Sequence, residues 1–279
     1  QIALAITAVF TVVEVIGGYI SGSLALLADA GHMLTDSMAL TLALVAFGIS
    51  ARPADSKRSY GYHRFQILAA FVNGMMLVAI VIWIFIEAVQ RLMSPPQVAA
   101  EMMLYVAAAG LVVNIVSFAV LHGGDQANLN MRGAALHVLG DLLGSVAAIS
   151  AALVILWNGW LPIDPILSIV VALLILRSAL YLVRQSAHIL LEGAPEWIDI
   201  KAMKSQLCAE VSEVSEIYHL HVWGLTPERL MLTMHIVLVD QESDRFSTVR
   251  SIKKILANDF GIDHSTIEVE IERCADDSC

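Results

Sequence analysis

Residues 28–36 read ADAGHMLTD and residues 134–141 read AALHVLGD, and both stretches lie inside long apolar runs. Each contains the pattern H-x-x-x-D, formed by His32 with Asp36 and by His137 with Asp141. On a helix, positions four residues apart share a face. Ionisable side chains inside a membrane span are costly and are usually functional. The two stretches therefore predict two transmembrane helices that each present one His and one Asp.

The residues around these motifs indicate a membrane domain. The chain has 279 residues, of which 58% are hydrophobic and 15% are charged. Soluble domains are about 45–50% apolar and about 25% charged. Runs long enough to cross a hydrocarbon core of about 30 Å occur at 1–21, 24–50, 65–92, 101–122, 132–157 and 164–189. The predicted fold class for residues 1–192 is a polytopic α-helical membrane domain with six transmembrane helices.

The C-terminal part has a different composition. Residues 1–190 carry 9 acidic and 8 basic side chains, whereas the remaining residues carry 17 acidic and 8 basic ones. Hydrophobic periodicity there predicts helix 198–211, strand 216–225, strand 230–240, helix 246–259 and strand 265–273. Residues 193–279 are therefore expected to form a small α+β domain of αββαβ order. Its acidity argues against nucleic acid as a partner.

The basic residues predict the orientation in the membrane. The second loop carries Arg52, Lys57, Arg58 and Arg64, whereas the first and fifth loops carry no Lys or Arg. By the positive-inside rule both termini are cytoplasmic, and a bacterial protein of this kind would lie in the inner membrane. Three cysteines without a CxxC pair fit a reducing compartment. Since the chain opens within an apolar stretch, without Met or a basic segment, we expect it to lack its native N-terminus.

The two motifs together predict a metal site. They occupy the second and fifth of six helices, the middle members of two triplets, which indicates an inverted repeat with its site near the midplane. Two imidazoles and two carboxylates suit tetrahedral Zn²⁺ at about 2.0–2.2 Å. These ligands lose protons when they bind metal, so exchange of protons for metal is a natural mechanism. The sequence thus favours a secondary active transporter, not an enzyme, that exports a divalent transition metal, with Zn²⁺ preferred.

Alternatives remain open for the polar residues of the predicted helices. Each His–Asp pair could be a structural hydrogen bond, and Asp29 could be a helix cap or part of an exit path. For Glu14, Asn73 and Asn114, interhelical hydrogen bonds are preferred over a pore-lining role. A membrane metalloenzyme is disfavoured because the sequence lacks H-E-x-x-H and four ligands leave no position for water. The third candidate function, after a transporter and a metalloenzyme, is a metal sensor that moves no ion.

Four spaced stretches resemble the cation diffusion facilitator family, in its zinc-preferring branch of bacterial zinc exporters and vertebrate zinc transporters. They are residues 28–36, 60–65 (YGYHRF), 128–141 (NLNMRGAALHVLGD) and 220–223 (LHVW). The resemblance implies a six-helix transmembrane domain, a cytoplasmic metallochaperone-like domain, homodimers and proton-coupled export of a divalent metal through His32, Asp36, His137 and Asp141. It departs from many relatives in one loop, where His122 stands in place of a His-rich segment.

The resemblance also implies functional residues outside the membrane. It implies a cytoplasmic zinc site of His221, His235 and Glu270, which would stabilise the dimer or sense cytosolic zinc. Further candidate ligands are His219, His264, Glu272, Cys274 and Cys279. Arg64 and Glu192 resemble a salt bridge of the family at the dimer interface, although Arg64 could equally be an ordinary positive-inside residue. The second intracellular loop offers only Asp55 and His63, so no ordered metal site is expected there.

Overall fold

The computed structural model describes the backbone of residues 2–122, 129–240 and 244–270. In residues 2–8, 117–122 and 129–140, and at positions 36, 39, 40 and 43, only the backbone is described. The chain divides into two compact units, one of Gln1–Val45 and Ala69–Val183 and the other of Ala46–Leu68 and Arg184–Cys279. Each unit has its own architecture and its own core.

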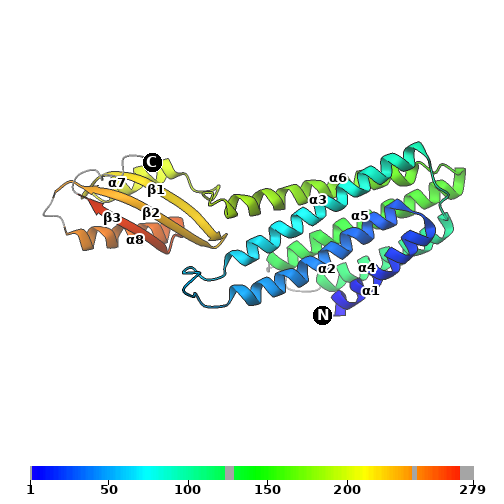
Figure 1. Ribbon diagram of the computed structural model, residues 1–279, viewed down its shortest axis with the longest axis horizontal. Coiled ribbons are helices and arrows are strands. Elements are labelled where there is room, and N and C mark those ends of the chain that lie inside the picture. The colour runs from blue at the N-terminus through cyan, green and yellow to red at the C-terminus, as the bar shows by residue number, and fades with distance from the viewer. Residues whose placement is uncertain (1, 123–128, 241–243, 271–279) are drawn as a thin grey trace. The chain divides into compact units, whose positions relative to one another are not determined.

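The apolar part of the chain forms six helices (Figure 1). They are α1 (Ile2–Ser21), α2 (Leu24–Ser50), α3 (Arg64–Met93), α4 (Ala100–His122), α5 (Leu129–Asn158) and α6 (Ile163–Leu190). Each follows a predicted run within three residues at either end. Among the described residues, Arg64–Met93, Asp141–Asn158 and Ile163–Leu190 are long and apolar enough to cross a membrane. The six predicted helices are therefore confirmed as helices.

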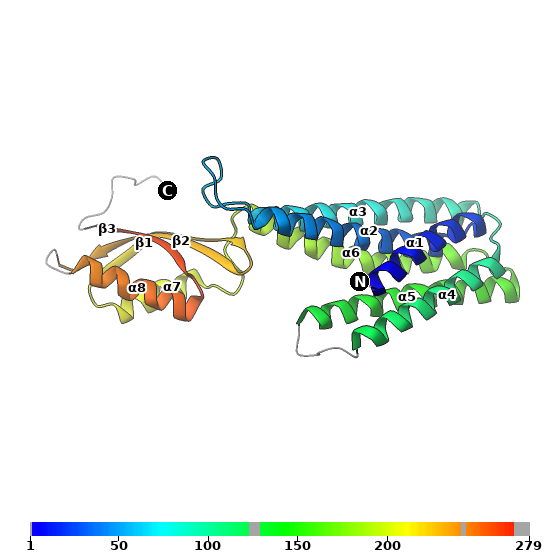
Figure 2. The ribbon, with the colours of Figure 1, turned by 90° about the horizontal axis from the view of Figure 1, so that it is seen from below.

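Helix α2 packs against other helices on two of its sides. Figure 2 shows it in one layer with α3 and α6, and the α4–α5 pair in a second layer. Its residues Ala25 and Leu26 are buried with small residues of α4 and α5, among them Ala107 and Ala148. One turn on, Ala28 is buried with residues of α3 and α6. Small side chains allow membrane helices to approach closely. The helix that carries the first H-x-x-x-D motif is thus held on both sides.

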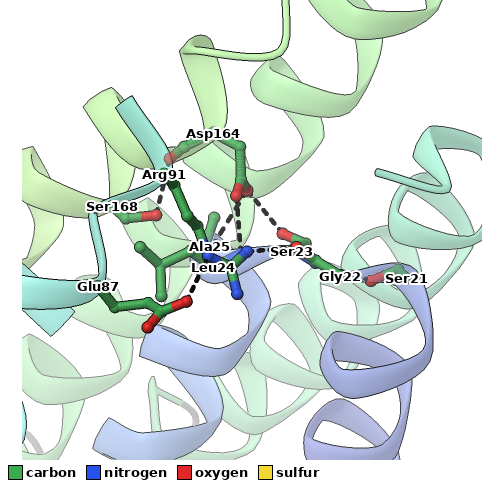
Figure 3. Close-up of polar contacts among 9 residues, drawn as sticks. All are labelled: Ser21, Gly22, Ser23, Leu24, Ala25, Glu87, Arg91, Asp164 and Ser168. Atoms are coloured by element: carbon green, nitrogen blue, oxygen red, sulfur yellow. Dashed lines mark hydrogen bonds and ion pairs between the residues drawn. The ribbon is translucent and has the colours of Figure 1, made fainter. Parts of the chain in front are cut away.

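The first turn of α2 is capped by a carboxylate from α6 (Figure 3). The buried Asp164 carboxylate accepts hydrogen bonds from the Ser23 hydroxyl and the Leu24 backbone N–H, both at 2.7 Å, and from the Ala25 N–H at 3.1 Å. Arg91 of α3 donates to the Gly22 carbonyl oxygen in the same connection. The first N–H groups of a helix have no partner within it, and a negative charge there also interacts favourably with the helix dipole. Asp164 therefore fixes the position at which α2 begins.

We expect Asp164→Asn to destabilise the membrane unit by about 1–3 kcal/mol, since a buried acceptor of three hydrogen bonds is weakened. The apparent melting temperature of the full-length protein in detergent measures this effect. Ser23→Ala is the matched variant: it removes one of the three bonds, so its effect should be smaller. An Asp164→Asn protein as stable as wild type would show that the cap contributes little.

The second unit confirms the predicted αββαβ order. It contains α7 (Ile200–Glu210), β1 (Val214–Thr226), β2 (Arg229–Leu238), α8 (Arg245–Phe260) and β3 (His264–Glu270). The sheet has the order β1-β2-β3, with β1 antiparallel and β3 parallel to β2. Asp199 and Asp244 cap the two helices by accepting backbone N–H hydrogen bonds at their first turns. The predicted third strand extended to residue 273, of which 271–273 lie outside the described residues.

Two helices cover one face of this sheet, and among the described residues of this unit no helix lies on the other face, which we call the open face. Met203 and Leu207 of α7 and Ile252 and Leu256 of α8 are buried in one core with alternate residues of the strands, and Figure 2 shows both helices on the same side of the sheet. On β2, Met234 and Ile236 belong to that core. Because successive strand residues point to opposite faces, His235 lies on the open face.

Candidate metal centres

The two H-x-x-x-D motifs meet in the first unit, where His32 of α2 lies opposite Asp141 of α5. The His32 Nε2 and Asp141 Oδ1 atoms are 3.8 Å apart. Asp141 is buried, with 6% of its surface exposed, and His32 is partly buried. Both residues lie within apolar helices, where an ionised carboxylate without a counter-charge is costly.

The distance between His32 and Asp141 suits shared coordination of an ion. A direct N–H···O hydrogen bond spans about 2.7–3.2 Å, so 3.8 Å is too long for one. Ligand atoms about 2.1 Å from a tetrahedral Zn²⁺ are separated by about 3.4 Å, which is close to the observed value. The pair therefore offers one nitrogen and one oxygen donor in an arrangement that a metal ion could bridge.

The other two predicted ligands are described only by their backbone. Asp36 lies in α2, four residues after His32, and His137 lies in α5, four residues before Asp141. Their side chains fall outside the described residues. Residues four apart on a helix lie on one face. Position 36 is therefore on the face of α2 that carries His32, and position 137 is on the face of α5 that carries Asp141.

Three other polar residues of the helices have distinct surroundings. Asn114 of α4 donates to the Ser145 hydroxyl of α5 at 3.2 Å, which confirms the predicted interhelical hydrogen bond. Asp29 does not cap α2, because that helix begins at Leu24 and Asp164 caps it. The hydrogen bond predicted for Glu14 is wrong: among the described residues, neither of its carboxylate oxygens has a hydrogen-bond partner.

A second group of potential ligands lies on the open face of the sheet in the other unit. His235 Nδ1 is 3.1 Å from Glu270 Oε1, and His235 Nε2 is 3.8 Å from Glu268 Oε2. One ligand atom from each of the three residues lies within 4.8 Å of the others. Tyr218 donates a hydrogen bond to the second oxygen of Glu270. One imidazole and two carboxylates form a donor set that suits zinc.

Glu268 was not among the predicted ligands, although the sequence contained a signal for it. Strand β3 alternates apolar Ile267 and Val269 with Glu268 and Glu270, so the two acidic residues share a face. The parallel register places Glu268 beside His235. The alternation was visible in the sequence, but the register was not.

The structure places the other predicted tail ligands differently. His221 lies opposite Thr233 on β2, two residues or about 7 Å along the strand from His235, and is exposed. His219 is close, with its ring centroid 5.2 Å from that of His235, and has a φ of 44°. His264 is exposed at the start of β3. Glu272, Cys274 and Cys279 lie outside the described residues.

Cys208, the cysteine whose surroundings the structure describes, is an unfavourable metal ligand. It lies on α7 and packs against the core, and burial raises the pKa of its thiol. A metal ligand has to be the thiolate, which this environment disfavours. The described thiol therefore does not add to the group around His235.

The loop before α3 uses its polar side chains internally. Tyr62 donates to Asp55 Oδ2 at 2.6 Å, and the backbone N–H groups of Lys57 and Arg58 donate to Asp55 Oδ1 at 2.8 Å. These bonds, with the Tyr62 bond first, lower the pKa of Asp55. His63 is in contact with Arg229. Asp55 and His63 thus each have partners within the second unit.

Arg64 and Glu192 form the predicted ion pair within the second unit. Arg64 Nη2 lies 3.0 Å from Glu192 Oε1, and the side chains are 34% and 62% exposed. An exposed pair of this kind contributes about 0–1 kcal/mol to stability. The contact is formed within one chain, and its role at a dimer interface stays a prediction.

Comparisons with known proteins cover both units. Residues 1–191 match the family described as "Cation efflux transmembrane domain", and residues 195–272 match "Cation efflux protein, cytoplasmic domain". The chain is 50% identical to the zinc transporter ZitB of Pectobacterium atrosepticum over 278 residues, which cover 99% of this chain and 86% of that protein. It is 43% identical to a "Cadmium, cobalt and zinc/H(+)-K(+) antiporter" of Bacillus velezensis over 265 residues, which cover 94% of this chain and 84% of that protein.

A solved structure also resembles part of the chain. It is the metal-bound C-terminal domain of the CzcD transporter from Cupriavidus metallidurans, with 31% identity and a TM-score of 0.24, and it covers 26% of this chain and 99% of that structure. The family matches span nearly all of the chain, from the apolar helices to the αββαβ unit. The chain therefore belongs to the cation efflux family, the cation diffusion facilitators, and is an integral membrane protein.

Proposed function

We propose that this protein exports Zn²⁺ from the cytosol in exchange for protons, through a site formed by His32, Asp36, His137 and Asp141. The observation that carries the proposal is the approach of His32 to Asp141 at 3.8 Å across α2 and α5. This contact joins the two motifs, which are far apart in the sequence. It supplies half of the proposed donor set from two different helices.

The chemistry of the four ligands accounts for both binding and release. Two carboxylates balance the charge of a divalent ion in a medium of low dielectric constant, and two neutral imidazoles complete a tetrahedral set. His32 and His137 bind metal only when they are unprotonated at the coordinating nitrogen. Protons arriving from the other side therefore compete with Zn²⁺ for the same atoms, and each ion is released as protons bind.

The known relatives support this substrate and this coupling. The Pectobacterium relative is named a zinc transporter, and the name of the Bacillus relative includes zinc and an exchange for H(+) and K(+). Residues 1–192 would form the transport domain, and residues 193–279 a cytoplasmic domain. Both termini would be cytoplasmic, because the basic residues concentrate in the loop that precedes α3.

The cytoplasmic domain would hold a second zinc ion and stabilise a homodimer. His235 and Glu270 fit this role, since their donor atoms lie 3.1 Å apart on the open face of the sheet. Glu268 extends the set suggested by the sequence, and the position of His221 opposite Thr233 makes that residue the weaker candidate. The positive charge of the bound ion would offset the repulsion between the carboxylates of Glu268 and Glu270.

We expect zinc uptake into proteoliposomes to require a pH gradient with the acidic side inside the vesicle. Protons leaving the vesicle then drive Zn²⁺ inward, and a fluorescent zinc indicator in the lumen measures the flux. A protonophore should reduce uptake to the level of vesicles without a gradient, and His137→Ala should remove gradient-driven uptake. Tight zinc binding without flux under any gradient would contradict transport and favour a metal sensor.

A further inference from the structure

Glu14 of α1 is a fully buried carboxylate, with 0% of its surface exposed. Neither Oε1 nor Oε2 has a hydrogen-bond partner among the described residues. Buried polar groups are nearly always hydrogen-bonded, and a carboxylate buried without a partner costs several kcal/mol or more. No part of the proposed four-ligand site accounts for Glu14.

Glycines provide the space that Glu14 and a second carboxylate occupy. A Cβ atom at Gly110 of α4 would lie 2.8 Å from Glu14 Oε1, and a Cβ atom at Gly144 of α5 would lie 2.6 Å from Asp29 Oδ1. Real Cβ atoms do not approach other heavy atoms so closely. The two acidic side chains are therefore fitted against bare backbone on α4 and α5, and Asp29 is only 3% exposed.

Asp29 of α2 and Gly144 of α5 each lie about one turn from the His32–Asp141 pair, and both lie towards the same end of the first unit. Asp29 precedes His32 by three residues on α2, and Gly144 follows Asp141 by three on α5. Three residues of helix span about 4.5 Å. The start of α2 and the end of α5 are at the end where Asp164 caps α2, which Figure 1 shows at the α1–α2 and α5–α6 connections.

Glu14 lies at a similar depth. It precedes the end of α1 at Ser21 by seven residues, and Asp29 follows the start of α2 at Leu24 by five. Measured from that end, the two are separated in depth by about 3 Å. Glu14 is also close enough to Asp29 and Asp141 for their carboxylates to influence it electrostatically. Glu14 is thus a buried carboxylate without a hydrogen-bond partner among the described residues, close in depth to a second buried carboxylate.

We propose that Glu14 and Asp29 form a second intramembrane site for a divalent metal ion, in addition to the four-ligand site. It would lie between the His32–Asp141 pair and the end of the unit at which Asp164 caps α2. Two carboxylates balance the charge of the ion, and metal would supply the partner that Glu14 lacks. This inference rests on the proposed function, in which Zn²⁺ passes this position on its way out. Oxygen ligands hold zinc less tightly than a set with imidazoles, so the ion would be released outward readily.

Zinc binding to the purified full-length protein tests this site. Equilibrium dialysis with Zn²⁺ should show that Glu14→Gln and Asp29→Asn each remove one weak equivalent per protomer. Both variants should retain the tighter equivalents at the four-ligand site and at the group around His235. Asp141→Asn should do the reverse, so it reports on the four-ligand site separately. Zinc efflux should fall about tenfold in Glu14→Gln, because the ion loses its exit position. Glu101→Gln, which removes an exposed carboxylate from the first turn of α4, is the matched control.

Glu14→Asp separates metal binding from packing. It keeps a carboxylate on a shorter side chain, so it should recover part of the weak binding, whereas the amide of similar shape in Glu14→Gln should not. If Glu14→Gln bound zinc with wild-type stoichiometry and affinity, the second site would be refuted and Glu14 would be a neutral acid in the packing. Should Glu14→Gln fail to fold, the same comparison with Asp29→Asn decides the outcome.

Discussion

Asp141→Asn is expected to lower zinc flux in proteoliposomes by at least about 100-fold. The asparagine side chain has a similar shape but lacks the charge that balances the ion beside His32. Breaking a buried charge interaction costs about 3–5 kcal/mol, which corresponds to a factor of roughly 100–4,000. The measurement is the initial rate of zinc uptake under an imposed pH gradient.

The control for this experiment is Glu101→Gln, which changes an exposed carboxylate of α4 and should transport zinc at the wild-type rate. Size-exclusion chromatography and tryptophan fluorescence show whether each variant is folded. Wild-type flux in a folded Asp141→Asn protein would contradict the assignment of the transport site. The contact with His32 would then be a structural link between α2 and α5.

His235→Ala is expected to remove the metal bound by the cytoplasmic unit and to reduce transport only in part. His235 contributes the only imidazole of the described group with Glu268 and Glu270. Loss of a residue that only supports a metal ligand already lowers metal affinity by about 10–100-fold, so loss of a ligand should have a larger effect. Zinc content after dialysis, measured by mass spectrometry, should fall by one ion per protomer.

His221→Ala is the matched comparison, because it removes an exposed histidine from the same strand pair. In the structure His221 lies opposite Thr233, outside the group around His235, so this variant should keep its zinc. Loss of zinc in both variants would instead favour the ligand set that the sequence suggested. Retention of zinc in His235→Ala would contradict a metal site on the open face of the sheet.

The sequence predicted those features that depend on neighbouring residues. Apolar runs of membrane length located all six helices. Backbone N–H and C=O groups in a membrane cannot bond to water, and in a helix they bond to each other. Alternation placed β2 and β3, because strand residues point to opposite faces in turn. The same local reasoning found the two H-x-x-x-D motifs, whereas the pair of Arg64 and Glu192 was suggested by the family resemblance.

Only the tertiary structure decided which distant groups meet. Asp164 begins α6 in the sequence, and only packing makes it the cap of α2. Glu268 lies beside His235 because of the parallel register of β3 on β2, whereas His221 of β1 lies opposite Thr233. Glu14 is buried without a hydrogen-bond partner among the described residues, and the glycine at position 110 lets α4 approach it closely.

One physical reason explains why the sequence predicted the helices and strands but not the contacts between distant residues. Helix and strand formation depend on hydropathy and on the repeat of a few neighbouring positions, which are read directly from the chain. The contacts of His32 with Asp141 and of His235 with Glu270 depend on register and on the close packing of separate elements. The sequence by itself therefore determined the elements and the kinds of ligand available, and the tertiary structure determined which ligands share a site.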